Sequence, residues 1–162
     1  MIREAEMRDL DALVNLFIAE NRHNANLAPE NVRVTNDVLS EQELRDIILD
    51  EKQLLLVGER EGMVTGALLG SITNVRERRW TPSNGYAYLE ELVVDPSSRR
   101  QGVAQELLAC FEAWARSQGA QGAQGASSID LYVWSNNHEA LGFCDKSGFK
   151  TKQHLLSKKL HD

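Results

Sequence analysis

The predicted architecture is organised around one segment, Leu89-Glu90-Glu91-Leu92-Val93-Val94-Asp95-Pro96-Ser97-Ser98-Arg99-Arg100-Gln101-Gly102-Val103-Ala104. A hydrophobic strand is predicted over residues 86–94, and it stops at Asp95-Pro96 because proline cannot donate to a sheet ladder. A polar turn with two arginines and a glycine follows. An amphipathic helix then begins near Gly102, with one apolar stripe formed by Val103, Leu107, Phe111 and Trp114.

The turn between this strand and this helix is a predicted anion site. The first N–H groups of a helix lack partners inside it and lie at the positive end of its dipole, which suits a pyrophosphate. Gly102 lets the backbone approach a ligand closely, Ala104 keeps the next position small, and Arg99 and Arg100 add positive charge. The short Arg-x-x-Gly-x-Ala motif alone also fits a solvated loop that caps a helix.

The rest of the chain alternates between strand and helix periods. Further strands are expected over residues 2–5, 53–60, 63–73, 129–134 and 150–160. Further helices are expected after a cap at Asp9, after the capping box Ser40-Glu41-Gln42-Glu43, and over residues 138–147, where Gly148 is the left-handed cap. A mobile loop or short irregular helix is expected over residues 21–37. Loops are expected over residues 76–85 and 118–126, the last a Gln-Gly-Ala repeat. In the second helix, Leu44, Ile47 and Ile48 are the expected buried face.

Composition indicates one globular domain over residues 1–162. Apolar residues make up 42% and charged residues 26% of 162 positions, the ordinary globular mixture. The net charge of −6 repels phosphate backbones, so nucleic acid is not an expected partner, whereas a cationic substrate would be attracted.

Metal and membrane chemistry are also disfavoured. Cys110 and Cys144 have no metal-ligand spacing, and the four histidines are scattered. The N-terminus is too charged for a signal peptide, and the apolar runs are far shorter than a membrane span. A cytoplasmic protein with no membrane partner and no metal is therefore expected.

The segment of residues 89–104 resembles the signature of the GNAT superfamily of N-acetyltransferases, Arg/Gln-x-x-Gly-x-Gly/Ala, at Arg99, Gly102 and Ala104. A second stretch of this chain resembles the second conserved block of the family, at Asn137, Ala140, Lys146, Gly148 and Phe149. The two blocks, at the family's separation and with its order of elements, cover essentially the whole chain. The resemblance implies a single-domain α/β fold: a mixed, mostly antiparallel sheet flanked by helices, with splayed central strands.

The resemblance also implies a site for acetyl-CoA as cosubstrate. Arg99 and the loop amides would bind the pyrophosphate, the amides being those of Arg100, Gln101, Gly102, Val103, Ala104 and Gln105. The main chain of Leu92, Val93 and Val94 would pair with the pantetheine arm as an added strand would. Asn137 would contact the arm from the other side, although an asparagine at this position fits a helix cap equally well.

Acetyl transfer to an amine requires the ammonium to lose a proton. Glu90 and Glu91 are adjacent on one strand and are therefore expected to point to opposite faces. One alternative is that one or both glutamates are charges at the edge of the sheet with no role in catalysis. However, the segment Tyr88-Leu89-Glu90-Glu91-Leu92 resembles a Tyr-Leu-Glu-Asp type found in polyamine and related small-amine acetyltransferases. Glu90 is assigned as the base or water-orienting group and Glu91 as a second amine-binding charge.

The sequence departs from the family at Cys144, where most members carry the tyrosine that protonates the leaving thiolate. A thiol can donate, since its unperturbed pKa is about 8.5. Three interpretations stay open: Cys144 is the acid, water or a tyrosine such as Tyr132 replaces it, or no acid is needed. A small buried hydrophobic side chain is the structural alternative for Cys144.

Together these features predict an acetyl-CoA-dependent N-acetyltransferase that acts by direct attack of a primary amine in a ternary complex. N–H groups near Val93 would polarise the thioester carbonyl. The acceptor would be a small cationic amine or an exposed protein amine. The resemblance places acceptor specificity in residues 21–37, residues 76–85 and the last strand, and self-association into a homodimer is a family expectation. The alternative is a non-catalytic coenzyme A-binding regulatory module on the same fold.

Overall fold

The computed structural model of the protein describes residues 1–118 and 125–162. It consists of two compact units, Met1–Tyr132 and Val133–Asp162, and each is described by itself. The repeat loop expected over residues 118–126 lies, except for its ends, outside the described residues.

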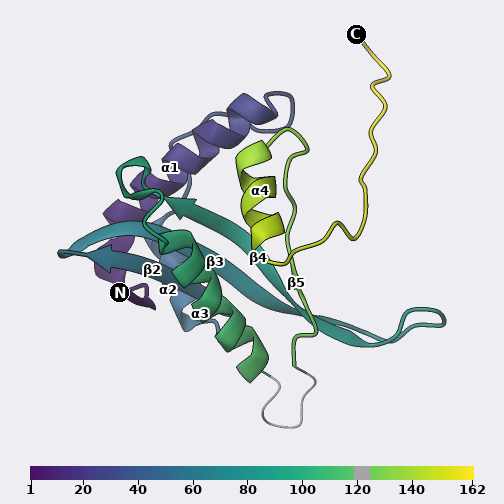
Figure 1. The fold of residues 1–162 in the computed structure, drawn as a ribbon, viewed down its shortest axis with the longest axis horizontal. Helices are drawn as coiled ribbons and strands as arrows, with labels where there is room; N and C mark the ends of the chain where they lie inside the picture. The colour runs from purple at the N-terminus through teal and green to yellow at the C-terminus, as the bar shows by residue number, and fades with distance from the viewer. Residues whose placement is uncertain (119–124) are drawn as a thin grey trace. The chain divides into compact units, whose positions relative to one another are not determined.

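The first unit is built on a five-stranded sheet in the order β1-β2-β3-β4-β5. The strands are β1 (Ile2–Glu4), β2 (Gln53–Arg60), β3 (Met63–Val75), β4 (Asn84–Val94) and β5 (Ile129–Asp130). Neighbouring strands are antiparallel from β1 to β4, and β5 is parallel to β4 (Figure 1). The predicted α/β fold with a mostly antiparallel sheet is confirmed.

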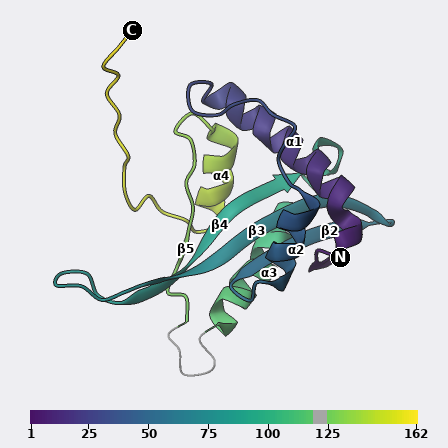
Figure 2. The ribbon, with the colours of Figure 1, turned by 180° about the vertical axis from the view of Figure 1, so that it is seen from behind.

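Helices cover both faces of this sheet. The helices α1 (Leu10–Leu27) and α2 (Glu41–Leu49) lie on one face and α3 (Val103–Ser117) on the other (Figures 1 and 2). Under α1 and α2, the core contains Leu13, Phe17 and Leu44, which pack against inward side chains of the strands. On the other face α3 packs so closely that a Cβ at Gly70 would lie 2.3 Å from Phe111 Cε1.

The strand β4 contains an extra residue. Glu91 pairs with Leu69 of β3, but Leu89 pairs with the next residue, Gly70, so Glu90 is left as a β-bulge. Leu89 therefore shares the face of Gly70, toward α3, whereas Glu91 shares the face of Leu69, toward the core under α1. A regular strand would have placed Leu89 and Glu91 on one face.

The central strands separate just before this bulge. β5 pairs with β4 only at Ala87–Ile129 and Tyr88–Asp130. The expected strand over residues 129–134 is thus much shorter than predicted. A bulge bends and twists its strand, which explains why the pairing stops there. In the part of the chain that the structure describes, no strand pairs with this edge of β4 between Leu89 and Val94.

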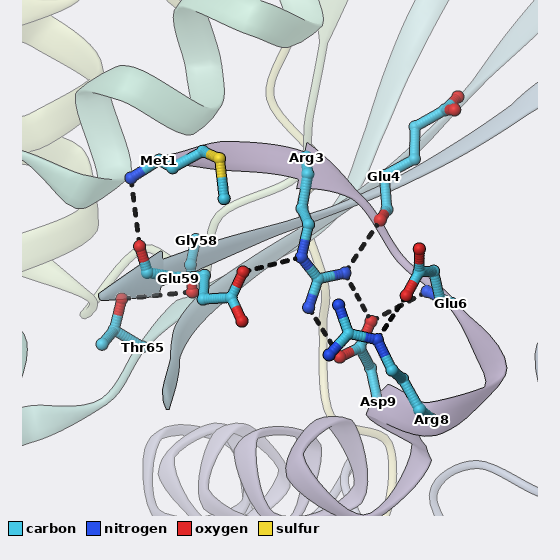
Figure 3. A network of polar contacts seen from close by, with 9 residues as sticks. All are labelled: Met1, Arg3, Glu4, Glu6, Arg8, Asp9, Gly58, Glu59 and Thr65. Atoms are coloured by element: carbon cyan, nitrogen blue, oxygen red, sulfur yellow. Dashed lines mark hydrogen bonds and ion pairs between the residues drawn. The ribbon is translucent and has the colours of Figure 1, made fainter. Parts of the chain in front are cut away.

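The start of the first helix differs from the prediction. Asp9 ends a short 3-10 turn, η1 (Met7–Asp9), and is the N-cap residue of α1, but its carboxylate does not cap that helix. It accepts hydrogen bonds from both terminal nitrogens of Arg3, at 2.8 and 2.9 Å, and from the Glu6 N–H (Figure 3). Arg3 Nε also donates to Glu59 of β2, so the network ties β1, β2 and α1 together.

The expectation of a loop or short irregular helix over residues 21–37 is wrong in its first part, because α1 continues as a regular helix to Leu27. The Asn21 side chain is engaged with the returning chain, donating to Arg33 O at 2.9 Å and accepting from the Thr35 N–H at 3.0 Å. These tertiary bonds outweigh the weak helix propensity of asparagine. The Ser40–Glu43 capping box is confirmed, whereas Ile48 is 41% exposed and does not belong to the buried face of α2.

The second unit contains α4 (His138–Lys146), and Gly148 follows it with a φ of +90°, as predicted for a left-handed cap. The last strand, expected over residues 150–160, is absent: residues 150–162 have no regular secondary structure and are exposed. Leu155, Leu156 and Leu160 are 80–92% exposed. A strand requires a partner and a buried face, and this lysine-rich segment has too few apolar side chains to provide the second.

Asp9→Asn should lower the free energy of unfolding by about 2 kcal/mol at pH 7, because it weakens a buried, charge-assisted pair. Hydrogen bonding to Arg3 lowers the pKa of Asp9, so this stabilisation is present above the ordinary aspartate pKa and is lost as the pH falls below it. Urea unfolding of both proteins from pH 7 to pH 3 should show the difference shrinking. Glu41→Gln, in the exposed Arg45–Glu41 pair, is the control and should cost at most a few tenths, about 0.3 kcal/mol.

Candidate active site

A pocket of about 460 Å³ lies between α1, α2, their connecting segment and β4. Its walls combine apolar, amide and carboxylate side chains. They belong to Phe17, Glu20, Asn21, Asn24, Val32, Thr35, Asp37, Val38, Leu39, Glu43, Ile47, Leu69, Glu90 and Glu91. A concave site with an apolar wall and a few convergent polar groups is the usual form of a small-molecule site.

Glu90 and Glu91 both line this pocket. The prediction that they point to opposite faces is wrong, because it assumed a regular strand. The bulge at Glu90 breaks the two-residue period and turns both carboxylates toward the same cavity. Glu90 is exposed and Glu91 is half-buried, so their environments differ even though they share a pocket.

The pocket is strongly acidic. Carboxylates reach it from Glu20 of α1, Asp37, Glu43 of α2 and the two β4 residues, and none of the described residues that line it is Lys, Arg or His. Burial, reinforced by the negative charges of Glu20 and Glu90, raises the pKa of Glu91 to about 7. Burial also raises the pKa of Glu20, against the opposing charges of His23 and Arg99. The pocket therefore favours a cation.

The range 21–37, where acceptor specificity was expected, does contribute to this pocket, whereas the contributions of Phe17 and Glu20 of α1 and of α2 were missed. Phe17, Glu20 and Asn24 lie on one face of α1 at helical spacing, which is visible in the sequence once the helix is extended beyond Asn21. The expected end of the first helix before Asn21 concealed this pattern. Asp37 and Glu43 carry no local signal, because they reach the pocket only through the return of the connecting chain.

The turn between β4 and α3 has the geometry of an anion site. It contains a 3-10 turn, η2 (Pro96–Ser98), then Arg100 and Gly102 with positive φ of +63° and +81°. The backbone N–H groups from Arg100 to Gln105 have no backbone acceptor among the described residues, whereas Glu106 N–H bonds to Gly102 O at 3.0 Å. Gly102 is the N-cap residue of α3, and the left-handed φ explains the need for glycine there.

The predicted residues of the first unit thus lie along one path. Leu92, Val93 and Val94 form the end of β4, with a strand partner on the β3 side alone within the described chain. Arg99, Arg100 and Gln101 follow in the turn. The first turn of α3 begins with Val103, Ala104 and Gln105. An extended arm with a terminal diphosphate would fit these two features in succession.

The remaining predicted residues belong to the second unit. Asn137 is the N-cap residue of α4 and accepts a hydrogen bond from the Ala140 N–H at 3.2 Å, so the capping role is the one observed. Cys144 lies in α4 and is 8% exposed. Burial raises the pKa of its thiol, which keeps the proton in place at neutral pH. Any role of either residue toward a coenzyme stays a prediction.

Two further features of the described chain bear on function. No group of three or more His, Cys, Asp or Glu residues in residues 1–118 and 125–162 is arranged to hold a metal ion. None of the helices in that part of the chain is both long and apolar enough to span a membrane.

The family comparison agrees with this arrangement of fold and site. A model of the acetyltransferase (GNAT) family matches residues 11–149. The chain therefore belongs to the GNAT acetyltransferase family, and its enzyme class is N-acetyltransferase.

Individual relatives extend this result. The chain is similar to the aminoglycoside N(6′)-acetyltransferase type 1 of Acinetobacter genomosp. 13, with 28% identity over 102 residues that cover 63% of this chain and 70% of the relative. A variant of the BH1408 protein from Bacillus halodurans has the same fold, with a TM-score of 0.91 at 17% identity over 99% of both chains. So has AAC(6′)-Iy in complex with the bisubstrate analogue CoA-S-monomethyl-acetylneamine, with a TM-score of 0.69 at 18% identity over 100% of this chain and 98% of that one.

Glu91→Gln should stabilise the protein at pH 8 by about 1–2 kcal/mol, because the raised pKa means that ionising Glu91 costs more in the folded than in the unfolded chain. In the wild type this cost grows as the pH rises from the ordinary glutamate value through about 7. Thermal unfolding from pH 5 to pH 8 should therefore show the two proteins diverging. Glu51→Gln makes the same chemical change at an exposed turn and should not diverge; equal behaviour of both variants would contradict the burial of Glu91.

Proposed function

We propose that this GNAT protein transfers the acetyl group of acetyl-CoA to a primary amine of a small polycationic acceptor, by direct attack within a ternary complex. The observation that carries the proposal is Glu91: a half-buried carboxylate with a pKa of about 7, in an acidic pocket, on the strand whose neighbouring edge is open. One domain over residues 1–162, a cytoplasmic location and a homodimer remain part of the proposal.

The coenzyme side of the proposed site is the turn and the open edge of β4. The N–H groups from Arg100 to Gln105 bind the diphosphate, with Arg99 and Arg100 adding charge, and Leu92, Val93 and Val94 pair with the arm. Asn137 stays a predicted contact of the arm. When bound, acetyl-CoA supplies an activated acetyl thioester. The backbone near Val93 offers N–H donors to the carbonyl oxygen as it gains negative charge.

The acceptor side is the acidic pocket. Its carboxylates attract ammonium groups, and its apolar wall, including Phe17 and Leu69, supports a carbon skeleton between them. The volume of about 460 Å³ suits a small molecule more than a protein surface. Relatives named for aminoglycosides, which carry several amines, support the polycationic class.

In this proposal Glu91 is the base and Glu90 binds and orients the ammonium, which reverses the roles assigned from sequence. An ammonium must lose its proton before its nitrogen can attack, and a base is most effective when its pKa is near the working pH. Burial gives Glu91 that property, whereas Glu90 is exposed to solvent. Cys144 is one candidate proton donor to the leaving thiolate, since its raised pKa retains the thiol proton. The alternatives are donation by water or a tyrosine such as Tyr132, or departure of the thiolate without an acid.

Thiol release from acetyl-CoA tests the proposed function. We expect release with polyamines and aminoglycosides, and much weaker release with monoamines and lysine-containing peptides, because a monocation makes fewer contacts with the acidic pocket. Isothermal titration with coenzyme A accompanies the assay. Binding without release by any amine would favour the non-catalytic coenzyme A-binding module, and absence of binding would contradict the proposal as a whole.

Glu91→Gln should reduce kcat/KM by about 10²–10³-fold, within the range for loss of a general base. In the wild type, kcat/KM should rise with pH through about 7 as Glu91 ionises, and the variant should lose this rise. Glu90→Gln is the matched comparison: it should raise the acceptor KM and shift the profile to lower pH, because it removes a charge that raises the pKa of Glu91. A Glu91→Gln profile identical to the wild type would exclude Glu91 as the base.

A further inference from the structure

The end of the β2–β3 hairpin contacts the turn between β4 and α3 at both ends of the turn. At its start, the Asp95 N–H donates to Thr65 O at 2.8 Å. At its end, the Arg60 guanidinium donates to two oxygens of Gln101: the side-chain Oε1, and the main-chain carbonyl at 3.3 Å. Thr65 is itself held, since its Oγ1 donates to Gly58 O (Figure 3). The turn is therefore tethered to a sheet element far from it in sequence.

The same hairpin also positions the first residue of α3. A Cβ built on Gly58 would lie 3.0 Å from Val103 Cγ1, and one on Gly66 would lie 3.1 Å from the same atom. Larger residues in these two positions would displace the start of the helix. The hairpin thus fixes the beginning of the turn, its end and the helix that follows.

The tethered stretch includes backbone that is unfavourable without support. Gln101 lies between Arg100 and Gly102, both with positive φ, and a left-handed arginine is a strained conformation. Such a conformation persists only when surrounding contacts hold it. At this point the observed contact is Arg60, which binds the middle residue of the three by its side chain and its main chain.

We infer that Arg60 is a positioning residue for coenzyme binding: by holding Gln101, it keeps the N–H groups from Arg100 to Gln105 directed outward as a preformed diphosphate site. This inference rests on the proposed function, because it concerns the same coenzyme site. Arg60 acts through the loop, so its removal leaves the donors in the chain but lets them reorient. Preformed donors cost less to order on binding than mobile ones.

The test measures coenzyme A binding by titration calorimetry, together with steady-state kinetics. Arg60→Met keeps the apolar part of the side chain and removes the hydrogen-bond donors. It should raise the coenzyme A Kd and the acetyl-CoA KM about 5–20-fold, as expected for loss of one or two charge-assisted hydrogen bonds. The kcat and the acceptor KM should stay within about twofold of wild type. Amide hydrogen exchange in residues 99–105 of the free protein should be faster. Arg45→Met, on α2, is the control and should match the wild type.

Two further variants separate positioning from simple charge. Gln101→Ala keeps every N–H group of the turn, so it should weaken binding in part, and the double variant should be no worse than Arg60→Met alone, because both changes break one contact. Arg60→Lys retains the charge but not the two-point contact, and should recover only part of the affinity. The inference would be overturned if Arg60→Lys had the wild-type affinity for coenzyme A and Gln101→Ala had no effect on it. A wild-type coenzyme A Kd in Arg60→Met would overturn it as well. If the wild type does not bind coenzyme A, the proposed function is refuted instead.

Discussion

The β-bulge at Glu90 is the constraint on which the site depends. One extra residue in β4 changes which face each later side chain occupies, so that Glu91 joins the face of Leu69 under α1 instead of the face packed against α3. The same bulge accompanies the end of pairing with β5 at Tyr88. The acidic pocket and the open backbone edge therefore arise from a single irregularity, which places a carboxylate beside the edge where an extended ligand can add.

The acidic pocket favours binding of a cation but lowers the stability of the free protein. Glu91 ionises within a pocket that already contains Glu20 and Glu90, so its charged form is disfavoured until a cation arrives. The cost is largest in the free protein above neutral pH. In the proposed function it would fall on binding of an ammonium, so part of the attraction for the acceptor would be relief of repulsion already present. The Arg3–Asp9–Glu59 network has the opposite character, since its charges are paired within the protein. It strengthens the sheet on which the pocket is built.

The sequence predicted those features that depend on neighbouring residues. The Ser40–Glu43 capping box, the strand over residues 53–60 and the glycine at position 102 have local causes, and all were placed correctly. Features that depend on distant contacts were missed. α1 passes beyond Asn21 because that side chain bonds to Arg33 and Thr35, and the bulge at Glu90 exists only through pairing with β3. Both errors concerned the acidic pocket, where Asn21 and Glu91 are positioned by chain that is remote in sequence.

The two halves of the site consequently have different supports. The turn that follows β4 is held by the β2–β3 hairpin through Thr65 and Arg60, elements of regular sheet. The acceptor pocket is walled by α1 and by the segment that returns from it, which is held by side-chain bonds such as those of Asn21. Substitutions in that segment can change the shape and charge of the pocket without disturbing the turn. In the proposed function, a coenzyme site fixed by the sheet and an acceptor site fixed by a loop would therefore vary independently, which gives a physical basis on which one fold can serve many amines.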